Sequence, residues 1–234
     1  MLLSFLCPTY GRAATENHLI SEMVWWFCQR TYADCELVIG NDHPRQTVVC
    51  PVPGVRVVNF PTRFKTFSDK LNALLAECRG EIVLPQDDDD VSLPDRAAQA
   101  VAALDGFDFW TPGRWWLAHG VRLVRADGNG VGWNCGAFRR EKFLGRYPPA
   151  YADADRRVKA WALENVRCSL DQTPDDDLLT YVYRWGVSRY HFSGRSDLKA
   201  AYDEAPGGGA GTFEVVPNPG VDWLSLTRAA CPSR

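Results

Sequence analysis

The stretch EIVLPQDDDDVSLPDR, from Glu81 to Arg96, contains the pattern around which the rest of the sequence is interpreted. Ile82 to Leu84 predict a short buried strand, and four aspartates, Asp87 to Asp90, follow its end. Polar groups at the carboxyl end of an apolar strand are typical of the ligand-binding edge of an open α/β sheet. Adjacent carboxylates repel one another unless a positive charge lies among them. A hard cation such as Mg²⁺ or Mn²⁺, which also binds a ligand's phosphates, would supply that charge.

A solvated acidic turn is the alternative interpretation of the four aspartates, because runs of like charge are most often exposed to water. The short run adjoins a buried-type strand, which favours a binding site. An EF-hand calcium loop does not fit, since counting from Asp88 puts Leu93 where that loop requires Gly and Gln99 where it requires Glu. This stretch alone leaves both the metal site and the solvated turn open.

The composition is that of a globular α/β protein. The chain has 234 residues, 46% hydrophobic and 24% charged, which is enough for one large domain. Its net charge of −3 gives no electrostatic basis for stable nucleic-acid binding. We expect no transmembrane segment and no signal peptide, because no apolar run is long enough and the first residues lack a basic region. The eight cysteines form no C-x-x-C pair, which argues against a zinc ribbon or redox motif. Because no export signal is expected, we expect reduced thiols and a cytoplasmic location.

Apolar strands alternate with amphipathic helices over the first hundred residues. This alternation predicts an α/β fold with a mostly parallel, twisted sheet covered by helices on both faces. The helix after residue 67 is expected to take Ser68 as its N-cap and to stop at Gly80. The predicted strands cover residues 2–6, 36–40, 55–59 and 82–84, and the predicted helices cover 15–30 and 68–80 and begin again near Pro94.

The loops after these strands carry polar side chains, namely Thr9 and Arg12, Asn41 and Asp42, Asn59, and Asp87–Asp90. Because the carboxyl ends of parallel strands meet at one edge of a sheet, we expect these loops to line a single cleft.

The second half is less regular. A hairpin is expected around Asp127–Gly130, and a helix over 175–185 follows Pro174, because carboxylates favour the first turn of a helix. Asp175, Asp176 and Asp177 are therefore explained by helix capping alone, unless a further motif assigns them chemistry. Other extended segments are predicted at 107–111, 114–125, 131–138 and 187–192, with helices at 139–144 and 152–164, a flexible loop at 205–212 and a weakly patterned tail.

Taken together, the motifs resemble those of the inverting glycosyltransferases of the GT-A fold, family 2, across about residues 2–192. The residues that carry the resemblance are the strand with PTYGR at 8–12, Asp42, KLNAL at 70–74 followed by Gly80-Glu81-Ile82, the D-x-D at 87–89, WNCGAFR at 133–139, and Asp175-Asp176 in place of the family's Glu-Asp pair.

The resemblance implies a metal-dependent inverting transfer from a nucleoside-diphosphate sugar, with a UDP-sugar favoured, to a hydroxyl of a glycan or another acceptor. It implies a Mn²⁺ or Mg²⁺ cofactor held by Asp89 and Asp87, with His191 as an optional further ligand. Asp175 or Asp176 would be the general base. The donor would contact Pro8, Thr9, Tyr10, Arg12, Asp42, Lys70, Asp87 and Asp88, and the acceptor and donor-sugar pocket would contain Trp133, Asn134, Cys135 and Gly136.

We expect one GT-A domain over residues 1–234, with a nucleotide-sugar half at 1–104, an acceptor half at 105–192 and a flexible carboxyl-terminal part at 193–234. Two alternatives remain at this stage. A noncatalytic descendant that binds nucleotide or sugar would keep the fold without the reaction. A nucleotidyltransferase would carry a glycine-rich phosphate loop after the first strand, where this chain has only Gly11.

Overall fold

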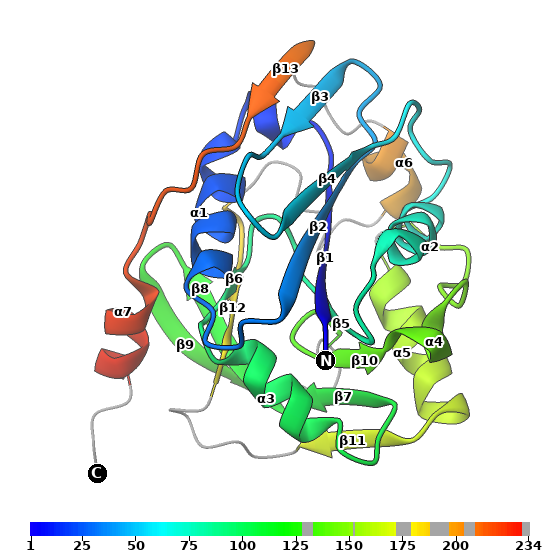
Figure 1. The fold of residues 1–234 in the computed structure, drawn as a ribbon, viewed down its shortest axis with the longest axis vertical. Helices are drawn as coiled ribbons and strands as arrows, with labels where there is room; N and C mark the ends of the chain where they lie inside the picture. Colours follow the sequence, from blue (N-terminus) through cyan, green and yellow to red (C-terminus); the bar gives the residue numbers. More distant parts are fainter. Residues whose placement is uncertain (128–132, 152, 172–178, 188–196, 204–208, 231–234) are drawn as a thin grey trace.

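The main sheet has seven strands in the order β11-β7-β10-β5-β1-β2-β4 (Figure 1). The structure is a computed structural model that describes residues 1–127, 133–151, 153–171, 179–187, 197–203 and 209–230. Strand β10 is antiparallel to both of its neighbours, and the other pairs are parallel. The predicted mostly parallel sheet is therefore confirmed. The strands are β1 (Leu3–Thr9), β2 (Cys35–Asn41), β4 (Val55–Asn59), β5 (Ile82–Pro85), β7 (Phe109–Pro112), β10 (Ala137–Arg139) and β11 (Cys168–Asp171).

Helices cover both faces of this sheet, as predicted. Successive side chains of a strand point to opposite faces, so Phe5 of β1 packs in one core with Ile20, whereas Leu6 packs in another with Leu74. The first core contains residues of α1 (Asn17–Cys28) and α3 (Arg96–Ala103). The second contains residues of α2 (Phe67–Glu77), α4 (Arg140–Phe143) and α5 (Ala154–Asn165).

A second sheet has the order β6-β12-β8-β9, and a short loop after the carboxyl end of β5 leads directly into its strand β6. The predicted helix over 175–185 is wrong at its end, because Tyr181–Arg184 forms strand β12. Its β-favouring residues pair with Val91 of β6 and Trp116 of β8. The strands are β6 (Val91–Ser92), β8 (Arg114–His119), β9 (Arg122–Asp127) and β12 (Tyr181–Arg184).

The hairpin of the second half and the bounds of α2 differ from the prediction. The hairpin of the second half turns between His119 and Arg122, which are paired across β8 and β9, so residues 114–125 are two strands and not one. Helix α2 is capped by Thr66 and not by Ser68, and it ends at Glu77, before Gly80. Residues 128–130 of the expected turn and 188–192 of the expected last strand lie outside the described residues.

The described residues of the carboxyl-terminal part form helices and a strand that the sequence pattern did not predict. Strand β13 (Gly211–Glu214) pairs in parallel with β3 (Gln46–Val49), and α7 (Trp223–Ala230) buries Trp223 almost completely. A short helix, α6 (Leu198–Asp203), precedes them. Among the described residues, no helix is long and apolar enough to cross a membrane.

Candidate functional site

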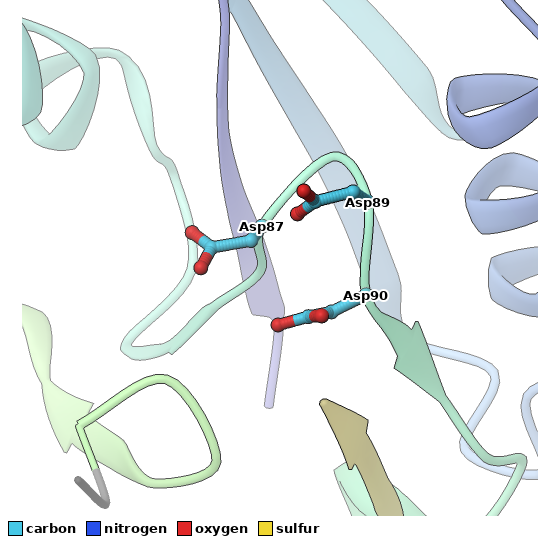
Figure 2. Close-up of side chains that lie close together, drawn as sticks. All are labelled: Asp87, Asp89 and Asp90. Carbon is cyan, nitrogen blue, oxygen red and sulfur yellow. The ribbon is translucent and has the colours of Figure 1, made fainter. Parts of the chain in front are cut away.

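The four aspartates lie in the loop of residues 86–90 between β5 and β6, which we call the acidic loop. The side chains of Asp87, Asp89 and Asp90 project to the same side of this loop (Figure 2), and each offers a carboxylate oxygen within 4.8 Å of the others. A set of carboxylate oxygens at this spacing suits a hard divalent cation such as Mg²⁺ or Mn²⁺. Asp90 is a further potential ligand; the motif comparison treated it only as an extension of the D-x-D at 87–89, whose register four consecutive aspartates leave open by one residue.

Burial and neighbouring negative charges raise the pKa values of Asp87, Asp88 and Asp90. Withdrawal from water, followed by the charge of Asp89, raises the pKa of Asp90 to about 8. Withdrawal from water also raises the pKa of Asp88 to about 6, although Arg12 opposes the rise. The pKa of Asp87 lies well above its ordinary value, mainly through burial and then through the charge of Asp90. Positive charge brought among these groups would favour the loss of the protons from Asp87 and Asp90.

Arg12 supplies part of that charge from the loop after β1. Its Nε lies 2.8 Å from Asp88 Oδ1, and its Nη2 lies 2.9 Å from Asp89 Oδ2. Burial would lower the pKa of Arg12, but Asp88, Asp89 and Glu16 outweigh burial and raise it. Arg12 and Asp88, both predicted as donor contacts, are thus ion-paired to each other, and Asp88 is not among the three grouped potential metal ligands.

Two neighbouring segments hold the other carboxylates through hydrogen bonds. Asn134 Nδ2 donates to Asp87 Oδ2. The Tyr181 hydroxyl donates to Asp90 Oδ2 at 2.6 Å, and the Arg184 backbone N–H donates to Asp90 Oδ1 at 2.8 Å. The orientation of the acidic loop therefore depends on residues 47 to 94 positions away in the chain.

Arg96, at the start of α3, is fully buried beneath the loop. Its Nη1 donates to Ser92 Oγ at 2.6 Å, and its Nη2 donates to the carbonyl oxygens of Pro85, at 2.7 Å, and of Asn134. Its guanidinium also lies 4.5 Å from the ring centre of Tyr181. Arg96 therefore joins the end of β5, the segment of Asn134 and β12 around the acidic loop; the sequence suggested only a helix start there.

A second group of predicted residues meets beside the acidic loop. Lys70 Nζ donates to Asp42 Oδ1 and to the Thr9 carbonyl oxygen, each at 2.6 Å, and all three residues are buried. The other Asp42 oxygen accepts from the Phe64 backbone N–H at 3.2 Å. Lys70 thus joins the carboxyl ends of β1 and β2, where the sequence predicted a nucleotide-binding cleft.

Tyr10 lies at the outer side of this corner and is partly exposed. Its ring centre lies 4.9 Å from that of His43, and the guanidinium of Arg63 lies 4.1 Å from it. Pro8, another predicted contact, is buried within β1 and pairs with Gly40 of β2. Tyr10 is therefore better placed than Pro8 to meet a ligand.

The predicted pocket segment 133–136 divides into two roles. Trp133 is buried and stacks on Phe109 and Phe138, at ring-centre distances of 5.2 and 5.1 Å, so it is a core residue and not a pocket wall. Asn134 contacts the acidic loop, as described above. Cys135 is buried in a cluster with Tyr181, and the Gly136 carbonyl accepts from Arg96 Nη2 at 3.4 Å.

Asp175, Asp176 and His191 lie outside the described residues. The described part of the chain instead places another carboxylate near the acidic loop. Asp155, in the first turn of α5, is among the charges that raise the pKa of Asp87. Its own pKa is raised, chiefly by burial. The sequence carried a signal for it, since Asp153-Ala154-Asp155 opens the predicted helix at 152–164, but helix capping explained the pair equally well.

Comparisons with known proteins agree with this geometry. Residues 4–114 match the sequence model described as Glycosyl transferase family 2. The fold matches S. aureus TarS (residues 1–349) in complex with UDP, with a TM-score of 0.61 and 16% identity over 79% of this chain and 60% of that one. It also matches the mannosyltransferase PcManGT from Pyrobaculum calidifontis in complex with GDP-Man and Mn²⁺, with a TM-score of 0.53 and 20% identity over 77% and 56% of the two chains. No curated protein matches the sequence significantly.

Residues 4–114 are therefore similar in sequence to glycosyl transferase family 2, and the chain has the GT-A fold of its structural neighbours. The chain spans about 60% of the length of the TarS structure that it matches.

Proposed function

We propose that this chain transfers a sugar from a nucleoside-diphosphate sugar to an acceptor hydroxyl, with inversion at the anomeric carbon and with Mn²⁺ or Mg²⁺ bound. The observation that carries the proposal is the convergence of Asp87, Asp89 and Asp90 beside the corner formed by Thr9, Asp42 and Lys70. A UDP-sugar is the proposed donor, because UDP and UDP-GlcNAc are the ligands named for the TarS structures of the same fold.

In the proposed reaction, the acceptor oxygen forms a bond to the anomeric carbon while the bond from that carbon to the diphosphate oxygen breaks. The acceptor proton passes to a carboxylate, and the nucleoside diphosphate leaves with the bonding electron pair. A bound divalent cation would stabilise the negative charge on the diphosphate. Asp87, Asp89 and Asp90 would hold the cation, and Tyr10 would stack against the base.

The general base must lie within hydrogen-bond reach of the acceptor hydroxyl. Asp175 or Asp176 is proposed on the basis of the family motif. Asp155 is a second candidate, favoured by its partial burial and its electrostatic influence on Asp87. A raised pKa suits a group that must take up a proton near neutral pH.

Nucleotide and metal binding provide the first test. We would measure the melting temperature with UDP, GDP, CDP and dTDP, each with and without Mn²⁺. A ligand at about 100 times its Kd stabilises the folded state by about 2.7 kcal/mol. We expect a shift that requires both UDP and Mn²⁺, and we expect Asp89→Ala to remove it. A wild-type protein that responds to no nucleotide would contradict the proposal and favour a noncatalytic descendant of the fold.

The base is tested by hydrolysis of UDP-GlcNAc, in which water takes the acceptor's place and release of UDP is measured. We expect one of two variants, Asp155→Asn or the double variant Asp175→Asn/Asp176→Asn, to lower this rate at least about 100-fold, in keeping with the usual contribution of a general base. That variant should keep the Mn²⁺-dependent UDP shift. Hydrolysis that survives in both variants would show that none of these three carboxylates is the base.

A further inference from the structure

Arg184 of β12 contacts the acidic loop through two different groups. Its backbone N–H donates to Asp90 Oδ1 at 2.8 Å, and its side-chain Nε donates to the Asp89 carbonyl oxygen. One residue therefore holds both the side chain of Asp90 and the backbone next to it. Arg184 belongs to the second sheet and lies far beyond residue 114, where the family match ends.

Glu22 of α1 holds the other end of the Arg184 side chain. Its Oε2 pairs with Arg184 Nη1, and both residues are buried, with 5% and 3% of their surfaces exposed. A buried ion pair is geometrically demanding, because removal of one partner leaves an uncompensated charge away from water. Glu22 therefore keeps the Arg184 guanidinium in the direction that reaches the acidic loop.

The carboxyl-terminal segment of residues 218–223 fixes Glu22 in turn. Glu22 Oε1 accepts from the Trp223 indole Nε1–H at 2.8 Å and from the Val221 backbone N–H at 2.9 Å. Gly220 has a φ of +57°, and a Cβ on it would lie 2.5 Å from the Glu22 carboxyl group. The segment thus requires Gly220 for its close approach to Glu22.

Trp223 also completes an apolar cluster next to the loop. It is 1% exposed and packs with Trp26 of α1, Val91 of β6 and Trp116 of β8. Val91 follows the acidic loop directly in the chain. The carboxyl-terminal segment is therefore connected to the acidic loop in two ways, by the hydrogen bonds through Glu22 and Arg184 and by the apolar packing of Trp223 near Val91.

We propose that Arg184 is a positioning residue for Asp89 and Asp90, and that Glu22 and residues 218–223 hold it in place. The carboxyl-terminal segment would then help to set the geometry of the proposed metal ligands through Glu22 and Arg184. The expected effect on metal affinity rests on the proposed function. The expected effect on the rigidity of the acidic loop does not.

The test compares Glu22→Gln with Glu36→Gln in the full chain. Glu36 is a matched control, because it is also buried and accepts from Ser4 Oγ and the Arg79 backbone N–H, each at 2.6 Å, in the first part of β2 and away from the acidic loop. Two quantities are measured for each variant, the hydrogen-exchange rate of residues 86–92 and the Kd for Mn²⁺ alone. A third variant, Trp223→Phe, removes the indole donor and keeps an aromatic ring.

We expect Glu22→Gln to speed exchange in residues 86–92 and to weaken Mn²⁺ binding by about 10-fold or more, as is usual when a group that orients a metal ligand is lost. Trp223→Phe should have a smaller effect in the same direction, and Glu36→Gln should leave both quantities at the wild-type values. Equal effects of Glu22→Gln and Glu36→Gln, or no change in exchange with Glu22→Gln, would overturn the proposal. Failure of the wild-type protein to bind Mn²⁺ would contradict the metal site of the proposed function, and the exchange rates would then decide the inference alone.

Discussion

Three arginines surround the four carboxyl groups of the acidic loop. Arg12 forms ion pairs with Asp88 and Asp89, Arg184 contacts Asp89 and Asp90, and the buried Arg96 supports the loop from below. The repulsion that suggested a metal from the sequence is therefore partly relieved by the protein's own side chains. The relief is incomplete, because the pKa values of Asp87 and Asp90 stay raised, first through burial and then through the charges of neighbouring aspartates.

This charge balance predicts how the metal-free protein responds to pH. The pKa of Asp90 is about 8 in the folded state, whereas an unfolded aspartate has a pKa of about 3.9. Between these values the folded state keeps a proton that the unfolded state has lost, so stability falls as the pH rises. We expect the melting temperature in EDTA to decrease from about pH 5 to about pH 8, by roughly 2–4 °C for each kcal/mol lost.

Asp90→Asn is the control for this pH effect. An asparagine at this position does not titrate, and its single side-chain oxygen can still accept one of the two hydrogen bonds that Asp90 accepts from Tyr181 and Arg184. The decrease in melting temperature over the same pH range should be smaller in Asp90→Asn. A decrease as steep as in the wild type would assign the pH dependence to other groups.

Among the elements, α2 shows how a local hydrogen bond decides where a helix begins. Thr66 Oγ1 accepts from the Asp69 backbone N–H at 3.1 Å, and Asp69 Oδ2 accepts from the Thr66 backbone N–H at 3.2 Å, which is a capping box. Ser68, the predicted cap, lies one residue inside the helix, and its buried hydroxyl has no hydrogen-bond partner among the described residues.

The capping box predicts a difference between two similar substitutions. Thr66→Ala removes a cap and should lower the free energy of unfolding by about 1 kcal/mol. Ser68→Ala removes a hydroxyl that satisfies no backbone group, so its effect should be smaller. Urea denaturation of both variants measures the difference, and a larger loss in Ser68→Ala would contradict the assignment of the cap.

At the scale of the whole molecule, the segment that connects α2 to β5 packs tightly against the backbone of β1. Gly80 of this segment lies directly against β1. A Cβ on Gly80 would lie 2.5 Å from the Ser4 backbone nitrogen and 2.7 Å from the Leu3 carbonyl carbon. The Gly80 N–H also donates to Ser4 Oγ at 2.8 Å. The close approach keeps β1 and β5 in register, so that Thr9 and the acidic loop leave the sheet at the same edge.

We therefore expect Gly80→Ala to destabilise the protein by about 2 kcal/mol or more, because backbone atoms must move to admit the methyl group. Gly209→Ala is the control, since a Cβ there has nothing within 4 Å. Its effect on the free energy of unfolding should be close to zero in urea denaturation. Equal free energies of unfolding for the two variants would show that the contact between Gly80 and the backbone of β1 has room for a methyl group.

Local sequence patterns were sufficient for the parallel sheet, its helices and the meeting of Thr9, Asp42 and the acidic loop, whereas Lys70 of α2 was assigned only from the resemblance to the family. Apolar periodicity specifies which face of a helix or strand is buried, and parallel strands bring their carboxyl ends to one edge. The candidate site could be predicted to this extent because its residues directly follow the strands.

Contacts between distant segments decided the rest. Residues 181–184 form a strand because β8 and β6 offer partners, although the preceding aspartates suggest a helix. Trp133 became core, Asp155 came near Asp87, and Glu22, Arg184 and Trp223 met around the acidic loop. Such contacts depend on how elements pack in three dimensions, and residues up to 201 positions apart leave no periodic pattern in the chain that would reveal their pairing.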